Sequence, residues 1–180
     1  MGKFLNYIVI SLLLICSLAL KSCSNDGCIE NQSSIPLAGF YSTETGESIA
    51  MSMLEVYGID ASDKNSLTDK DNPIKQVYLP LRATQNNTAF LIHYGEYGDA
   101  VEYNDTIWID YNTTPYFASE ECGATFRYEI TSIRHTDLFI DSIEVVDPVI
   151  TNVDVERIKI FFKTIATVLK RENIYTNSCL

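Results

Sequence analysis

Basic residues are scarce in this chain. Its 180 residues include 13 lysines and arginines against 24 aspartates and glutamates, which gives a formal net charge of −11. Nucleic-acid binding needs a basic face against the phosphates, so this charge disfavours a nucleic-acid partner. It also disfavours adsorption to anionic lipid, so membrane attachment would have to come from another feature of the chain.

Histidines are equally scarce, and no glycine-rich phosphate loop is present. The only two histidines, His93 and His135, lie far apart in the sequence, whereas a zinc site needs about four clustered ligands. The acidic loop around Asp60, Asp63 and Asp69 offers hard oxygen atoms that could hold calcium, but its spacing departs from the EF-hand pattern. We therefore expect no cofactor, and we interpret this loop as solvated rather than as a calcium site.

Long uncharged apolar runs are absent except near the beginning of the chain. Lys3 precedes such a run at residues 7–20, and a helix needs roughly 20 apolar residues to span a bilayer. The run is shorter than that and matches the apolar region of a signal peptide. We expect residues 1–22 to form a signal helix that is cleaved on export.

The sequence Leu20-Lys21-Ser22-Cys23 resembles the lipobox of bacterial lipoproteins, with Lys21 as a departure from the usual small or apolar residue. The resemblance implies cleavage before Cys23 and lipid attachment to its thiol. Acyl chains on that cysteine would anchor the protein stably to a membrane. We expect residues 23–34 to be a polar tether and the location to be the bacterial outer membrane, on either face. The alternatives are an ordinary secretory signal that leaves Cys23 as a plain thiol, and an uncleaved anchor.

Three of the five cysteines would remain as thiols after export, in a compartment where disulfides persist. They are Cys28, Cys122 and Cys179, which permit one bridge and one leftover thiol. We favour Cys28–Cys122, and pairing of Cys179 with Cys28 or with a second molecule stays open because sequence alone cannot fix connectivity.

Apolar residues alternate with polar ones through most of residues 35–163, a pattern typical of half-buried strands. The clearest example places Phe126, Tyr128 and Ile130 on one side of a strand. The expected strands are residues 35–43, 49–57, 75–81, 88–94, 106–111, 125–131, 137–147 and 157–163. About eight short strands predict an all-β fold, either an antiparallel β-sandwich or a Greek-key barrel, followed by a tail at residues 164–180. Residues 155–171 also fit a helical stripe, but their β-branched and aromatic content favours a strand as far as Lys163.

Several short runs carry a resemblance that covers about residues 28–162. They are Cys28-Ile29-Glu30, Phe40-Tyr41, Val56-Tyr57-Gly58, Leu79-Pro80-Leu81, Cys122-Gly123 and the run from Ile140 to Val146. In this order they resemble an uncharacterised family of small bacterial lipoproteins with a domain of unknown function. The resemblance implies an all-β exported domain and favours the Cys28–Cys122 bridge, but it implies no activity and no functional residues.

Aromatic residues give the best candidate for a binding surface. Trp108 should share a strand face with Thr106 and Asp110, and Tyr111, Tyr116 and Phe117 follow closely. An exposed aromatic group beside carboxylates can stack on a sugar ring or on a partner protein. The alternative is a Trp108 buried in the core, as tryptophan often is.

Paired carboxylates could instead indicate a glycoside hydrolase. The candidates are Glu120 with Glu121, and Asp105 with Asp110, but a regular strand puts the second pair on opposite faces. We therefore expect a non-catalytic binding or scaffolding domain, anchored by its lipid, with an envelope protein or a glycan as its partner. A carbohydrate-active hydrolase and a subunit that assembles through its strand edges are the alternatives.

Overall fold

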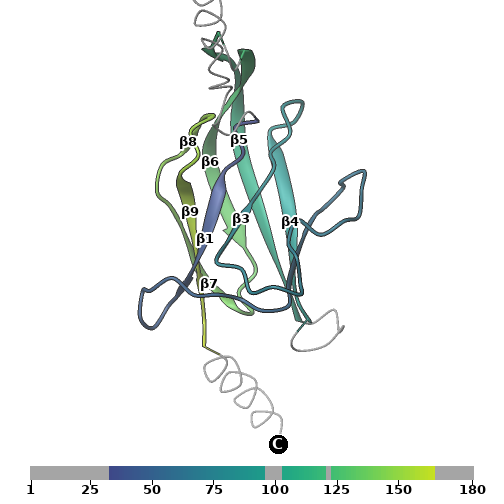
Figure 1. Cartoon of the computed structure of the whole chain (residues 1–180), viewed down its shortest axis with the longest axis vertical. Helices are drawn as coiled ribbons and strands as arrows, with labels where there is room; N and C mark the ends of the chain where they lie inside the picture. Colours follow the sequence, from purple (N-terminus) through teal and green to yellow (C-terminus); the bar gives the residue numbers. More distant parts are fainter. Residues whose placement is uncertain (1–32, 96–102, 121–122, 165–180) are drawn as a thin grey trace, which may run out of the picture.

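Two β-sheets lie face to face in the computed structural model of the chain (Figure 1). The structure describes residues 33–95, 103–120 and 123–164. Within these ranges it contains nine strands and no α-helix, and no helix there is long and apolar enough to cross a membrane. The predicted all-β sandwich is therefore confirmed, while the signal helix and most of the tether and tail lie outside the described residues.

One sheet has four strands and the other has five. The four-stranded sheet runs in the order β3 (Gln76–Tyr78), β1 (Leu37–Ser42), β9 (Glu156–Phe162), β7 (Ile140–Val145). The five-stranded sheet runs in the order β2 (Leu54–Gly58), β4 (Asn87–Tyr94), β5 (Asn104–Ser119), β6 (Gly123–His135), β8 (Val149–Ile150). β1 and β9 pair in parallel, and the other paired strands are antiparallel.

Alternation of apolar and polar residues explains where the core forms. Every second residue of β4 and of the first half of β5 is buried, because successive side chains of a strand point to opposite faces. β9 follows the same rule and buries Ile158, Ile160 and Phe162, so the expected strand is confirmed and the helical alternative is wrong for residues 156–162, while residues 165–171 lie outside the described residues. Edge contacts between Tyr94 and Phe162, with ring centroids 6.3 Å apart, join the two sheets.

β5 and β6 are much longer than the sequence pattern suggested. We expected residues 112–115 to be a turn, but they lie inside β5, paired with residues 126–129 of β6. β4 reaches only as far as Asp110, so beyond this point β5 has no neighbour on that side among the described strands. Pro115 is tolerated because a strand that is an edge needs no donor on its open side.

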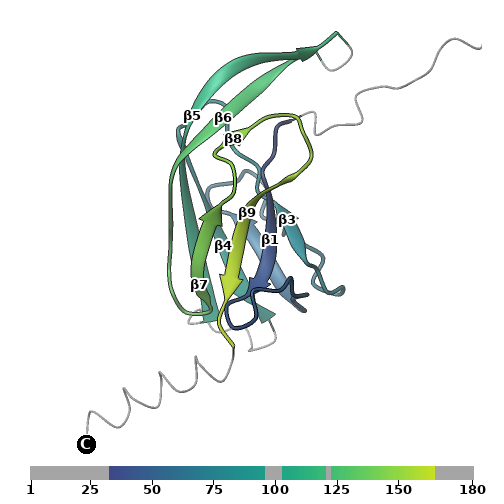
Figure 2. The same cartoon turned by 90° about the vertical axis from the view of Figure 1, so that its left-hand side faces the viewer.

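The distal parts of β5 and β6 therefore form a two-stranded extension, which we call the arm: residues 112–119 and 123–127. Figure 2 shows the arm continuing past the end of the four-stranded sheet. Tyr128 and Glu129, at the base of the arm, pair with the short strand β8, which the sequence pattern did not indicate. The arm thus projects from the same end of the sandwich at which β8 lies.

Other expected strand limits were too wide. Residues 49–53 form no regular strand, and only an isolated bridge joins Met51 to Ile74. β7 begins at Ile140 rather than at Asp137. The cause of this later beginning is a buried side chain, Asp105, whose contacts are described below. Ser34, at the end of the expected tether, is fully buried.

Candidate functional site

Trp108 lies on the outer face of the five-stranded sheet, in the middle of β5. The alternation in β5 buries Ile107 and Ile109 and leaves Trp108 half-buried on the other face, with Thr106 and Asp110. Its neighbours directly across the sheet are Ala89 on β4 and Arg134 on β6. The predicted face-sharing with Thr106 and Asp110 therefore agrees with the strand geometry, and Trp108 is not a core residue.

Charged groups flank the indole of Trp108. The guanidinium carbon of Arg134 lies 5.9 Å from the centre of the Trp108 ring, within the range of a cation–π contact. The same guanidinium pairs with the Asp110 carboxylate at 3.5 Å, and the two side chains are 64% and 36% exposed. On the β4 side, the small side chain of Ala89 adds little bulk beside the ring. The arrangement is an aromatic ring with one cation and one anion beside it.

Only part of the expected aromatic group joins Trp108. Tyr111 lies in the core, 1% exposed, because its side chain points to the opposite face of β5 from Trp108. Its hydroxyl accepts a hydrogen bond from the Arg82 backbone N–H at 2.9 Å and donates to the Arg82 carbonyl at 3.0 Å. Tyr116 is half-buried and Phe117 is 65% exposed, but both lie further along β5, in the arm. Tyr111 therefore cannot present its ring to a ligand, while Tyr116 and Phe117 lie in the arm on opposite faces of β5, beyond Trp108.

The most elaborate polar site is built around Asp105, which is fully buried. Asp105 and Asp110 face opposite sides of the sheet, as the odd spacing indicated, so they cannot flank one glycosidic bond. The Asp105 carboxylate accepts five hydrogen bonds, from two hydroxyls and three backbone N–H groups. The donors are Tyr94 Oη (2.8 Å), Thr136 Oγ1 (2.5 Å), Leu138 N (3.0 Å), Phe139 N (2.8 Å) and Ile140 N (3.1 Å).

These bonds give Asp105 a structural role. A buried carboxylate is costly unless hydrogen bonds compensate for the lost water, and here both oxygens are surrounded by donors. Three of the donors are successive backbone N–H groups that would otherwise join a strand ladder, which explains why β7 begins only at Ile140. The carboxylate thus fastens the connection between β6 and β7 to β5. Sequence reasoning treated Asp105 as a candidate acid, although its place in an otherwise apolar alternation was a signal of burial.

Burial also affects the tyrosine that binds Asp105. Tyr94 is 2% exposed, and its ring packs against Phe139 with centroids 4.5 Å apart. Burial, and then the nearby charge of Asp105 and the hydrogen bond to it, hold the pKa of Tyr94 well above its ordinary value. The hydroxyl therefore stays a donor to Asp105 over the whole neutral range.

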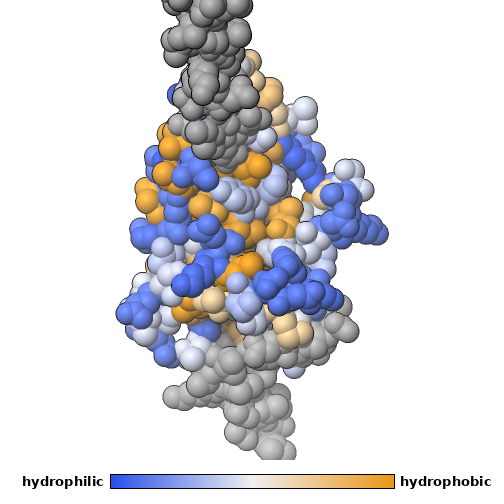
Figure 3. Space-filling model, viewed as in Figure 1, coloured by the Kyte–Doolittle hydropathy of each residue, from blue (hydrophilic) through white to orange (hydrophobic). Residues whose placement is uncertain are grey.

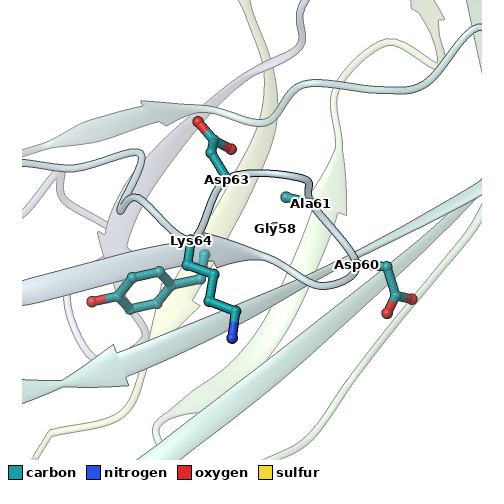
Figure 4. Close-up of a pocket in the computed structure, with 6 residues that line it drawn as sticks. Gly58, Asp60, Ala61, Asp63 and Lys64 are labelled. Atoms are coloured by element: carbon teal, nitrogen blue, oxygen red, sulfur yellow. The ribbon is translucent and has the colours of Figure 1, made fainter.

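The acidic loop after β2 does not assemble a metal site in the structure. Asp60, Asp63 and Lys64 line a surface hollow of about 540 Å³, and Figure 4 shows the two carboxylates pointing in different directions. The Asp69 carboxylate accepts hydrogen bonds from the Asn72 side chain at 2.7 Å and from the Asp71 backbone N–H at 3.0 Å. The described residues hold no cluster of three or more acidic, histidine or cysteine side chains that could bind a metal ion.

The histidines also lie apart. His93 Nδ1 is 2.7 Å from the side-chain oxygen of Asn104, and His135 Nδ1 is 2.7 Å from the Thr136 carbonyl. Glu120 is exposed, at the distal end of the arm. Glu121 and the cysteines Cys23, Cys28, Cys122 and Cys179 lie outside the described residues, so the lipid attachment and the disulfide stay predictions.

The outer edge of β2 is covered by its own loop. The Leu67 backbone N–H donates to the Val56 carbonyl at 2.7 Å, and Thr68 Oγ1 donates to the Leu54 carbonyl at 2.6 Å. β3 and β8, which each end one of the sheets, are only three and two residues long, whereas β7, which ends the four-stranded sheet on its other side, has six residues. Covered or very short edge strands offer little template for pairing with another chain.

Comparison with known proteins gives a family but no activity. No curated protein and no solved structure matches the chain. One family model matches residues 53–162, more than half of the chain, and it runs from the residue before β2 to the end of β9. The match therefore includes the five-stranded sheet, the arm and the Asp105 site, and the chain belongs to the family of unknown function DUF6452.

Proposed function

We propose that this protein is a lipid-anchored lipoprotein of the bacterial outer membrane, and that its β-sandwich is a non-catalytic binding domain for an envelope protein or a surface glycan. Support for the anchor comes from the short apolar run at residues 7–20 and the lipobox-like sequence that ends at Cys23. The net charge of −11 favours solubility and discourages non-specific adsorption, so a covalent lipid is the consistent means of attachment.

The observation that carries the binding role is the position of Trp108. A large aromatic side chain placed half-exposed on the outer face of a sheet gains less from burial than it would in the core. Such a side chain is what a binding surface uses, because a rigid indole offers a large contact area at low entropic cost. The guanidinium of Arg134 and the carboxylate of Asp110 add a donor and an acceptor beside it.

The lipid and the sheet face would act together. Anchoring concentrates the domain at the membrane surface and so raises its effective concentration toward any partner there. Hydroxyl groups of a sugar can bond to Asp110 and Arg134 while the ring stacks on Trp108, and a protein loop can make the same contacts. Neither partner requires a catalytic group.

Affinity capture from solubilised envelopes tests this role. The bait is the lipidated protein, compared with its Trp108→Ala form, and bound protein and bound carbohydrate are both analysed. We expect the Trp108→Ala protein to capture about tenfold less partner than the wild type, because substitution of a hot-spot aromatic residue weakens binding by at least that much. Phe117→Ala, which removes an exposed aromatic ring from the arm, serves as the matched control and should capture as the wild type does.

Thermal unfolding of each variant shows that the fold survives the substitution. Undiminished capture by a folded Trp108→Ala protein would refute the sheet face as the binding surface. Loss of capture in the Phe117→Ala control alone would mean that the arm, and not Trp108, makes the contact.

A further inference from the structure

The arm carries an apolar face that continues the inner surface of the five-stranded sheet. Residues directly opposite in a ladder share a face, so the pairings Pro115–Phe126 and Phe117–Ala124 place these four side chains together. Phe126 lies two residues before Tyr128, which is buried in the core, so the shared face is the one that looks inward in the sandwich. Phe117 is nevertheless 65% exposed and Phe126 is 41% exposed.

These rings are exposed because no described strand lies opposite them. Figure 2 shows the arm running beyond the level at which β1 and β9 begin. An inward sheet face normally gains its stability from the facing sheet, and here that partner is missing. The arm therefore presents apolar surface whose cover must come from outside the described sandwich.

Other exposed apolar side chains gather at the same end of the molecule. β1 begins at the arm end of the sandwich. Its first residue, Leu37, pairs with Tyr78 at the end of β3 and with Glu156 at the beginning of β9, so these strand ends lie there too. The exposed apolar residues beside these strand ends are Tyr78 (41%), Val146 (48%), Val153 (43%) and Val155 (44%). Figure 3 shows apolar surface in orange over the upper part of the visible face, near the position of β8 in Figure 1.

The proposed anchor leads to this same end. Cys23 lies ten residues before Ser33, the first described residue, so the segment between them spans at most about 35 Å when fully extended. The eight arm residues of β5 extend about 26 Å from the sandwich. A domain held by Cys23 therefore keeps the end at which β1 begins within about 35 Å of the bilayer, a distance of the same order as the length of the arm.

We propose that the arm end of the sandwich faces the membrane and that Phe117 and Phe126 contact the lipid surface, an inference that rests on the lipid anchor of the proposed function. Acidic side chains at this end, Glu120, Glu129 and Asp154, outnumber the exposed Arg127 of the arm and disfavour anionic headgroups, so the surface suits a zwitterionic phospholipid. The contact orients the domain and leaves the Trp108 face, on the outer side of the sheet, directed along the membrane toward its partners.

Quenching by brominated lipid tests the contact. The lipidated protein carries the substitution Trp108→Phe, which removes its native tryptophan. Each variant then contains a single introduced tryptophan as the fluorescent probe. The variants are reconstituted on phosphatidylcholine vesicles that contain brominated phosphatidylcholine. Phe117→Trp and Phe126→Trp are the two probes. Leu67→Trp is the matched control, since Leu67 is 41% exposed, like Phe126, but lies beside the outer edge of β2.

We expect both arm probes to be quenched and to shift their emission to shorter wavelength on the vesicles, with no change in the Leu67→Trp control. Arm probes that keep the control's emission on vesicles to which the protein is bound would overturn the proposal. An emission shift that occurs without vesicles and grows with protein concentration would also overturn the proposal, because the arm would then pack against a second copy of the chain. A protein that fails to float with the vesicles refutes the anchor itself, and this proposal with it.

Discussion

At the scale of single residues, Asp105 and Asp110 show how the position of a carboxylate decides how much it contributes to the stability of the fold. Both belong to β5, but Asp105 is fully buried under five donors and Asp110 forms an exposed pair with Arg134. Hydrogen bonds to a charged group contribute about 1.5–3 kcal/mol each, and a buried donor left without a partner costs a further 1–3 kcal/mol or so. The two residues therefore form a natural comparison.

We predict that Asp105→Asn lowers the free energy of unfolding by about 3 kcal/mol or more, because the new NH₂ group would face backbone N–H donors. Asp110→Asn should cost less than about 1 kcal/mol, as exposed ion pairs do. Urea unfolding of the two variants measures the difference. Equal and small losses would mean that the Asp105 network does not hold the connection between β6 and β7.

Tyr94 makes the free energy of unfolding depend on pH in the alkaline range. Since burial and Asp105 raise the pKa of Tyr94 in the folded state, the unfolded chain releases this proton first, near pH 10. The contribution of Tyr94 is therefore complete below about pH 10 and is lost as the pH rises toward its folded pKa. We expect the free energy of unfolding to fall with pH above that point, and to fall less steeply in Tyr94→Phe. Identical slopes in the two proteins would contradict this assignment.

At the scale of elements, the arm should be the least stable part of the long strands. Its β5 residues have a neighbouring strand on one side only among the described strands, whereas residues 107–110 have neighbours on both sides. We predict that hydrogen-bonded amides of residues 113–118 exchange through local opening, with smaller opening free energies than those of Ile107 and Ile109. Native-state hydrogen exchange measures both sets, and equal protection would show that the arm is stabilised by contacts beyond the ladder.

The elements also show what sequence reasoning can reach. Period-two alternation located β4, the first half of β5 and β9, because burial on one face follows directly from the pleat. It failed at residues 112–115. Their sequence is typical of a turn, but they continue β5 in the arm, where one side of the strand is open, and strand propensity did not indicate this. It also failed at residues 137–139, whose backbone bonds a distant side chain, a long-range contact that local patterns cannot contain.

The candidate site was predicted to a similar extent. Alternation alone put Trp108 on a face with Thr106 and Asp110 and separated Asp105 from Asp110. It did not separate Tyr111 from the exposed aromatic residues, although its odd spacing from Trp108 places it on the opposite face. Arg134 was not anticipated, because its contact with Trp108 depends on the register between β5 and β6.

At the scale of the whole molecule, the proposed location and orientation of the domain depend on the lipid. In the proposed arrangement, the lipid on Cys23 and the arm hold one end of the sandwich at the bilayer, and the Trp108 face stays open. Without a lipid, the acidic domain would have little tendency to adsorb to a membrane, and a partner confined to the envelope would be met only by diffusion.

Mass spectrometry of the protein purified from host membranes tests this claim most directly. We predict that the mature chain begins at Cys23 and carries the mass of a diacylglycerol and an acyl group on that residue. A chain that begins at its initiator methionine, or a Cys23 without fatty acid, would contradict it.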